Sequence, residues 1–485
     1  MALATEQTES AKIRAQLNHP VIDVDGHHLE FQPAMSDYLR QAMGPTLYDQ
    51  WRQADAAQAP TMDERRDWRQ EQQVWWSAPA VNTLDRAAAA LPELFHTRLD
   101  DLGVDFSILY TTAGLGPIRD AHDDVRQAFC YGINEFYAEQ YGAYADRMTP
   151  AGLIPMHTPA EALAELDHCK QLGLKVVLLP SGVPRPIPAL HRNHPELFPQ
   201  VNWLDTFGLD SAHDYDPVWQ RLTDLGFAAT FHTHQPHAGL MKSSKSLTSY
   251  VFNHLGAHFS IMYEVCKSLL MGGVTYRFPN LQFAFLECGV HWACGLLADF
   301  VEHWEKRNRN SIQHYDPSRI DRDLWLHLHR EWGGKLVTPY QDQLSQLLQK
   351  DLDNPIRKMY EPDELDDFIH CGIQTKADIA DRFQNFHFGC ESDDRTVAFA
   401  FHPANAFGMR LKAMFSSDVG HWDVNDNLDI LCNSYKLVQR GFLAEPDFRD
   451  FMADNPIGLH GKMNAEFWRG TVVEDYATKV LEPTV

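Results

Sequence analysis

Short apolar runs that alternate with helical stretches constrain the fold of this chain more than any other feature. After an opening run at 21–24, such runs lie at 104–110, 151–155, 174–180, 227–234, 281–287 and 411–418. Nearly unbroken apolar runs are typical of strands buried on both faces, as in a parallel sheet covered by helices. At least six strands separated by helices predict an α/β fold, and their number favours a (β/α)8 barrel of the TIM type over an open sheet.

Helices are predicted between these runs, at about 121–144, 158–172, 217–225 and 246–270. Thr158 and Pro159 suit the N-cap and the first position of the second of these helices. No glycine-rich GxGxxG or GxxxxGK loop is present in the sequence. A nucleotide-binding fold is therefore the weaker alternative.

The whole chain, 1–485, is interpreted as a single barrel domain with three additions. Residues 32–100 are rich in Ala, Gln, Arg and Trp and are expected to form an N-terminal helical cap. Residues 305–380 are charged and are expected to form a helical insertion, and 445–485 a C-terminal extension. Barrels of this type accept long insertions within one domain.

Charge and cysteine content exclude several classes of partner. Asp and Glu number 66 against 42 Lys and Arg, for a formal net charge of −24. Nucleic acid and anionic membrane are therefore not expected to bind. The eight cysteines are scattered, and no apolar stretch reaches the ~18 residues of a membrane span. We expect a cytoplasmic protein with a small-molecule substrate, as a homo-oligomer or, alternatively, a hetero-oligomer.

Ionisable residues follow several of the apolar runs. In the opening stretch, alternation places Asp23, Asp25 and His27 on one face of a strand. A bound cation offsets the cost of burying several carboxylates, whereas the alternative is a solvated turn. His232, His234, Glu287 and Asp418 also end apolar runs, where barrel enzymes keep their chemistry. The spacing alone is weak evidence, because about one HxH pair is expected by chance among 25 histidines.

Four segments in order resemble a known family. They are 22–27 (IDVDGH), 231–232 (FH), 272–292 and 417–423 (SDVGHWD). The chain resembles the amidohydrolase superfamily and, within it, the branch that includes aminocarboxymuconate semialdehyde decarboxylase and related aromatic-acid decarboxylases. This resemblance implies a distorted (β/α)8 barrel with one or two divalent metal ions at its C-terminal mouth.

The resemblance also implies a set of metal ligands. Asp25 and His27 match the ligands of the first strand, with Asp25 in place of a histidine. His232 matches the histidine of the fifth strand, and Asp418 matches the aspartate that binds metal and handles the proton of the attacking water. Glu287 stands where many members have a histidine. This carboxylate-rich set extends the candidate metals from zinc to manganese and iron.

Further residues are assigned less directly. We expect Asp418, His291 and His421 to be catalytic; the alternative for the two histidines is a structural role at a helix start. His234 and Glu391 are additional candidate ligands or substrate-binding groups. Lys175 begins its apolar run rather than ending it, so it is not assigned as the bridging lysine of the family.

Such a site predicts a metal-dependent hydrolase that attacks a carbonyl of a small organic substrate, aromatic or carboxylated, with metal-activated water. A non-hydrolytic metal-dependent decarboxylase is the first alternative. The others are an oxygen-activating enzyme with dinuclear iron or manganese and iron, and a catalytically decayed subunit of a hetero-oligomer.

Overall fold

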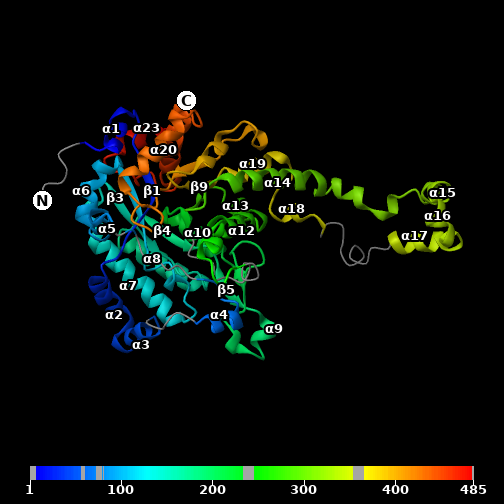
Figure 1. Ribbon diagram of the computed structural model, residues 1–485, viewed down its shortest axis with the longest axis horizontal. Coiled ribbons are helices and arrows are strands. Elements are labelled where there is room, and N and C mark those ends of the chain that lie inside the picture. The colour runs from blue at the N-terminus through cyan, green and yellow to red at the C-terminus, as the bar shows by residue number, and fades with distance from the viewer. Residues whose placement is uncertain are drawn as a thin grey trace.

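The core of the molecule is a barrel of parallel strands. The computed structural model describes residues 7–55, 61–72, 79, 81–232, 245–352 and 365–482. Within these residues an eight-stranded sheet has the order β1-β2-β3-β4-β7-β8-β9-β10 (Figure 1). Its strands are β1 Ile22–His27, β2 Phe106–Tyr110, β3 Met148–Leu153, β4 Val176–Pro180, β7 Ala229–His232, β8 Phe283–Phe285, β9 Phe386–Cys390 and β10 Lys412–Phe415.

All neighbouring strands of this sheet are parallel, and the predicted (β/α)8 barrel is confirmed. The two edge strands are joined where the barrel closes. Asp418 N donates to Asp25 O at 2.8 Å, and His27 N donates to Val419 O at 2.8 Å. The turn after β10 is thereby fixed against the end of β1.

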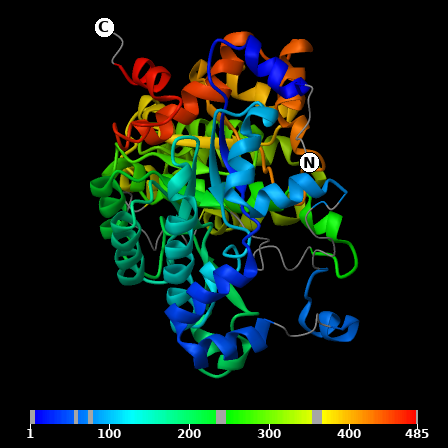
Figure 2. The same cartoon turned by 90° about the vertical axis from the view of Figure 1, so that its left-hand side faces the viewer.

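Helices surround the sheet and connect its strands (Figures 1 and 2). The predicted helix at 158–172 is α8, and a capping box between Thr158 and Glu161 begins it. The helices are α1 Glu9–Gln16, α2 Gln32–Met43, α3 Pro45–Asp55, α4 Met62–Trp68, α5 Thr83–Ala90, α6 Pro92–Leu102, α7 Asp123–Tyr141, α8 Pro159–Gln171, α9 Pro188–His191, α10 Asp216–Leu225, α11 Tyr250–His254, α12 Ala257–Met271, α13 Val274–Arg277, α14 His291–Arg307, α15 Arg322–Trp332, α16 Gly334–Val337, α17 Leu344–Leu352, α18 Asp367–His370, α19 Lys376–Phe383, α20 Ile430–Gln439, α21 Glu445–Arg449, α22 Asn455–Gly461 and α23 Glu474–Leu481.

Three elements differ from the expectations. The helix expected at 246–270 is divided into α11 and α12, because Gly256 between them has a left-handed φ of 74°. Strand β9 was not predicted from the sequence. A two-stranded antiparallel sheet of β5 Val183–Pro186 and β6 Asn202–Asp205 was not predicted either.

The three predicted additions contain mostly helices in the described residues. Helices α2 to α6 lie in 32–100, α15 to α18 in 305–380 and α21 to α23 in 445–485. In Figure 1, α15 to α17 project from the barrel beyond the end of α14. The boundaries of the three additions stay predictions. No described helix combines the length and the apolar character that crossing a membrane requires.

A buried carboxylate connects β1, β2 and the turn after β10 beneath the mouth of the barrel. Asp23 accepts hydrogen bonds from Ser417 N at 3.0 Å, from Ser417 Oγ at 2.8 Å and from Ser107 Oγ at 3.1 Å. A bulge between Asp23 and Gly26 shifts the register of β1 against β2. The regular alternation expected for β1 therefore does not hold, and Asp23 bonds to these serines instead.

We predict that Asp23→Ala destabilises the fold. The substitution leaves buried donors on Ser107 and Ser417 unsatisfied, and each such donor costs about 1–3 kcal/mol. Urea unfolding should show a loss on the order of 3 kcal/mol for Asp23→Ala and a smaller loss for Ser107→Ala. Equal stability of Asp23→Ala and the wild type would contradict this role.

Candidate metal centre

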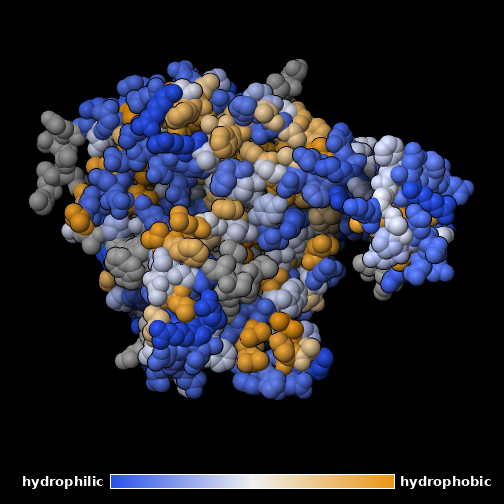
Figure 3. Space-filling model, turned by 45° about the vertical axis from the view of Figure 1, so that its right-hand side comes forward, coloured by the Kyte–Doolittle hydropathy of each residue, from blue (hydrophilic) through white to orange (hydrophobic). Residues whose placement is uncertain are grey.

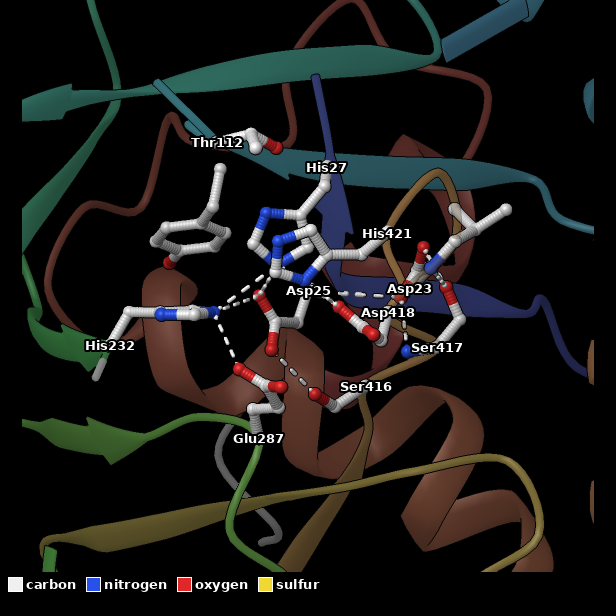
Figure 4. A network of polar contacts seen from close by, with 12 residues as sticks. Asp23, Asp25, His27, Thr112, His232, Glu287, Ser416, Ser417, Asp418 and His421 are labelled. Atoms are coloured by element: carbon white, nitrogen blue, oxygen red, sulfur yellow. Dashed lines mark hydrogen bonds and ion pairs between the residues drawn. The ribbon is translucent and has the colours of Figure 1, made fainter. Parts of the chain in front are cut away.

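Four strands of the barrel deliver ionisable side chains to one place at the C-terminal mouth (Figure 4). Asp25 and His27 lie at the end of β1, and His232 ends β7. Glu287 and Asp418 follow β8 and β10 by two and three residues. All five side chains are buried, with residue exposures of 4% or less. Five residues from distant parts of the chain are thus brought together.

The donor atoms of these residues have the separations expected of ligands to one ion. His232 Nε2 lies 3.2 Å from Glu287 Oε2 and 3.7 Å from Asp25 Oδ1. His27 Nε2 lies 3.2 Å from His232 Nε2 and 3.2 Å from Asp418 Oδ1. Ligands bound about 2.1 Å from a single ion lie roughly 3.0–3.5 Å from one another. The arrangement therefore fits a coordination shell.

Four buried polar atoms at the site have no hydrogen-bond partner among the described residues. Three belong to candidate ligands, namely Asp25 Oδ1, Glu287 Oε2 and Asp418 Oδ2, and the fourth is Nε2 of the neighbouring His421. Buried polar atoms nearly always have a partner, so four at one place require an explanation. Two groups of potential ligands have donor atoms within 4.8 Å of one another: Asp25, His27 and His232, and His27, Glu287, Asp418 and His421. This nitrogen and oxygen donor set fits a divalent metal ion.

The electrostatics of the site give the same indication. Burial, together with the charges of Glu287 and Asp418, raises the pKa of Asp25 well above its usual value. Burial and the charge of Asp418 raise the pKa of Glu287, and burial and the charge of Asp423 raise that of Asp418. Burial lowers the pKa of His27 well below its usual value. Neutral imidazoles beside carboxyl groups are the forms that bind a cation after the carboxyls lose their protons.

Neighbouring side chains orient the candidate ligands. Ser416 Oγ donates to Asp25 Oδ2 at 2.8 Å, which leaves Asp25 Oδ1 towards the histidines. The His421 ring stacks on His27 with centroids 4.0 Å apart, and His421 Nδ1 donates to Asp418 Oδ1 at 2.9 Å. Contacts of this kind fix the position of ligands around a metal.

The backbone at two of the candidate ligands is in an unusual conformation. Glu287 has φ 51° and Asp418 has φ 55°, in the left-handed region that non-glycine residues rarely adopt. Such residues cost about 1–3 kcal/mol and are concentrated at functional sites. The first turns after β8 and β10 thus hold their carboxylates at the site at some cost in stability.

A cavity of about 720 Å³ opens beside this group. Glu287 and Asp418 are on its wall, together with His258, His291 and Glu391. The other three candidate ligands, Asp25, His27 and His232, are not among the lining residues. A small molecule bound in this cavity would lie next to two of the five candidate ligands.

The remaining predicted residues have different positions. His291 is the exposed first residue of α14, contacts the Phe259 ring and belongs to neither group of potential ligands. Glu391 follows β9 on the cavity wall, where burial and the charge of Asp418 raise its pKa to about 7. His234 lies outside the described residues. Lys175 Nζ donates to Phe467 O at 3.1 Å, near the start of β4, so it does not reach the mouth of the barrel.

Sequence reasoning missed His258, whose Nδ1 lies 3.1 Å from Glu287 Oε1. It comes from helix α12 rather than from a strand end, where candidates were sought. The available signal was the spacing of His254 and His258 by four residues within the predicted helix at 246–270, although the structure places the two on α11 and α12.

We predict that His232→Ala strongly reduces metal binding, because it removes a nitrogen that faces Asp25, His27 and Glu287. Elemental analysis and competition with a chelator should show a loss of affinity on the order of 100-fold or more. His291→Ala is the matched control and should keep its metal content. Equal metal content in the two variants would contradict the assignment.

We predict that the metal-free protein loses stability as the pH rises above about 6.5. The raised pKa values mean that the folded chain holds protons on Asp25, Glu287 and Asp418 that the unfolded chain releases above about pH 4. The free energy of unfolding therefore falls as the pH rises from about 4 towards the raised pKa values, and the fall ends above them. Below about pH 6.5 the buried neutral histidines oppose this trend.

The measurement is urea unfolding across this pH range, with and without metal. The free energy of unfolding should fall with pH in the metal-free protein and fall less when metal is bound, because the cation replaces the protons of the carboxyls that bind it. A flat profile for the metal-free protein would contradict the crowding of buried carboxyls.

Comparison with known proteins identifies the family. The family model described as Amidohydrolase matches residues 22–310, more than half of the chain. A solved amidohydrolase from Mycobacterium avium subsp. paratuberculosis K-10 superposes with a TM-score of 0.53 at 16% identity, over 92% of this chain and 100% of that chain. At this identity the superposition shows a shared fold.

Two solved decarboxylases are also similar to the chain. The 5-carboxyvanillate decarboxylase LigW from Sphingomonas paucimobilis has a TM-score of 0.47 and 14% identity, over 91% of this chain and 98% of that chain. A dihydroxybenzoic acid decarboxylase from Polaromonas sp. JS666, solved with manganese, has a TM-score of 0.49 and 16% identity, over 93% and 99%.

The family match confirms the resemblance seen in the sequence. It spans β1, β7 and β8, which carry four of the five candidate ligands or immediately precede them. The chain belongs to the amidohydrolase family and is an enzyme, a hydrolase or a decarboxylase, with a donor set suited to a divalent metal.

Proposed function

We propose that this enzyme is a metal-dependent decarboxylase that removes a carboxyl group, as carbon dioxide, from a small aromatic acid. Hydrolysis, the first choice from the sequence, becomes the second candidate. The observation that carries the proposal is the crowding of three buried carboxyl groups, those of Asp25, Glu287 and Asp418, the last two of which line the cavity.

Crowding favours a proton donor over a proton acceptor. A divalent ion compensates two negative charges, so the third of three buried carboxyls is stabilised by keeping its proton. Asp418 suits this role because it lines the cavity, where a substrate would reach it, whereas Asp25 does not. Hydrolysis needs Asp418 as a base, whereas decarboxylation needs an acid that protonates carbon.

The reaction then divides between the metal and the protein. Asp25, His27, His232 and Glu287 would hold the ion, which supplies an electrophile that withdraws electron density from the substrate. The bond between the ring carbon and the carboxyl carbon breaks, and its electron pair remains on the ring carbon. Asp418 transfers its proton to that carbon. His421, which donates to Asp418 Oδ1 at 2.9 Å, orients this carboxyl group.

Two further observations support the proposal. The motifs around Asp25, His232 and Asp418 resemble the branch that includes the aromatic-acid decarboxylases. The two groups of potential ligands share His27, which favours a single ion, and Lys175 lies too far from the mouth to bridge a pair.

One observation favours hydrolysis as the second candidate. The described residues that line the cavity include Glu391, Asp393 and Asp423, and neither Lys nor Arg is among them. An acidic wall attracts a neutral ester, amide or lactone more than a substrate with several negative charges.

The two reactions are distinguished by incubating the metal-loaded enzyme with hydroxybenzoates and aminobenzoates and with their esters, amides and lactones. Decarboxylation in D2O should release carbon dioxide and leave deuterium on the ring carbon. Hydrolysis in H2¹⁸O should place ¹⁸O in the product acid. Product with ¹⁸O and no carbon dioxide across the panel would overturn the proposal in favour of hydrolysis.

We predict that Asp418→Asn lowers turnover about 100-fold or more, because an amide cannot donate a proton as a carboxylic acid does. Steady-state kinetics with the accepted substrate provide the measurement, normalised to bound metal. Asp393→Asn is the matched control, since Asp393 is an exposed carboxylate on the same cavity wall outside both ligand groups. Wild-type turnover in a metal-loaded Asp418→Asn variant would exclude Asp418 as the donor.

A further inference from the structure

A helical arm extends from the body of the molecule and carries an apolar surface without a partner. The arm, residues 311–352, begins after α14 and contains α15, α16 and α17. In Figure 1 it lies far to the right of the barrel, and Figure 3 shows pale and orange residues on it among hydrophilic ones. It is unrelated to the candidate metal centre.

The exposed apolar residues of the arm form a stripe. Leu324, Leu328 and Trp332 are four residues apart and lie on one face of α15, and Leu336 follows in α16. Trp332 is 77% exposed and Leu336 is 80% exposed, and no residue of α15 is buried. An amphipathic helix is stabilised mainly by packing its apolar face. This face has no packing partner among the described residues.

The arm has only a small interior of its own. Val337, Leu344 and Leu348 are its buried apolar residues among those described. So small a cluster contributes little to stability, because short helical segments rarely bury enough area alone. The stripe is therefore a surface that an additional partner would stabilise.

A largely apolar groove lies at the base of the arm. Its volume is about 520 Å³, and Met271 of α12 and Leu296 and Phe300 of α14 line it. Tyr315, an exposed residue at the start of the arm, is also on its wall. Two arms packed antiparallel about a two-fold axis place the tip of each against the base of the other.

Charge favours a second copy of the chain as the partner. The whole chain carries −24, and two such bodies repel each other. Residues 311–352 contain five Lys and Arg and six Asp and Glu, so the arm is almost neutral. The arm is therefore a region where two copies can meet at little electrostatic cost.

The exposed area is also adequate. The four side chains of the stripe are 43–80% exposed, so together with their neighbours they remove on the order of 500 Å² per arm. With the matching groove and both copies, the contact reaches about 2,000 Å², above the ~1,000 Å² of a specific interface. We infer that the arm forms a two-fold dimer by packing its Leu324–Leu336 stripe into the groove at the base of the partner arm.

The test is sedimentation velocity of the full metal-loaded chain at about 1–50 μM and ~150 mM salt. The wild type should be a dimer, and Trp332→Glu with Leu336→Glu should weaken the dimer at least ~30-fold. Met271→Glu in the groove should also weaken it. Gln341→Glu with Gln343→Glu adds the same charge at exposed polar sites of the arm and should leave the dimer unchanged.

Circular dichroism and metal content serve as controls for correct folding of the variants. Both should equal the wild-type values, because Trp332 and Leu336 are exposed in the single chain. The milder pair Trp332→Ala and Leu336→Ala gives a second test of the stripe. A monomeric wild type, including one whose stripe is covered by its own chain, would overturn the inference. A wild-type dimer that neither the glutamate pair nor the alanine pair at Trp332 and Leu336 weakens would also overturn it. If the stripe substitutions weaken the dimer and Met271→Glu does not, the groove is not the docking surface.

Discussion

The cost of removing carboxylates from water is the constraint on which the rest of this site depends. Asp25, Glu287 and Asp418 are buried at the mouth of the barrel, and each has an oxygen without a hydrogen-bond partner among the described residues. Such groups must keep protons or share a cation. The imidazoles of His27 and His232 supply nitrogen ligands, so a cation is the partner that satisfies carboxylates and histidines together.

The barrel supplies the geometry because its closure and its candidate ligands use the same residues. Asp418 N and His27 N form the hydrogen bonds that join the turn after β10 to β1. Asp23 anchors Ser417 beneath that turn, and the neighbouring Ser416 orients Asp25. The left-handed backbone at Asp418 is held between these contacts. Folding and preparation of the site are therefore a single event.

The sequence predicted what depends on local pattern. Apolar runs gave the barrel, and the residues that end those runs, such as His232 and Asp418, are the ones that the structure brings together. Strand β9 was not predicted because the polar residue His387 interrupts its apolar run, although that imidazole is fully buried. The bulge in β1 and the contact of His258 with Glu287 depend on tertiary packing, which periodicity does not encode.

Reaction type was the least predictable property, because one donor set serves hydrolysis and decarboxylation alike. The structure adds the crowding of carboxyl groups beside the cavity, which favours a proton donor. The arm adds a second property, an exposed apolar face, on which our proposal of contact between copies rests. Both properties depend on which side chains remain unsatisfied after the chain has folded.

The most direct test of the central claim is a crystal structure of the protein grown with Mn²⁺, with anomalous scattering recorded for the metal. The account predicts an anomalous peak about 2.0–2.4 Å from Asp25 Oδ1, His27 Nε2 and His232 Nε2. Clear electron density for these side chains with no peak among them, or with manganese bound only elsewhere, would contradict it.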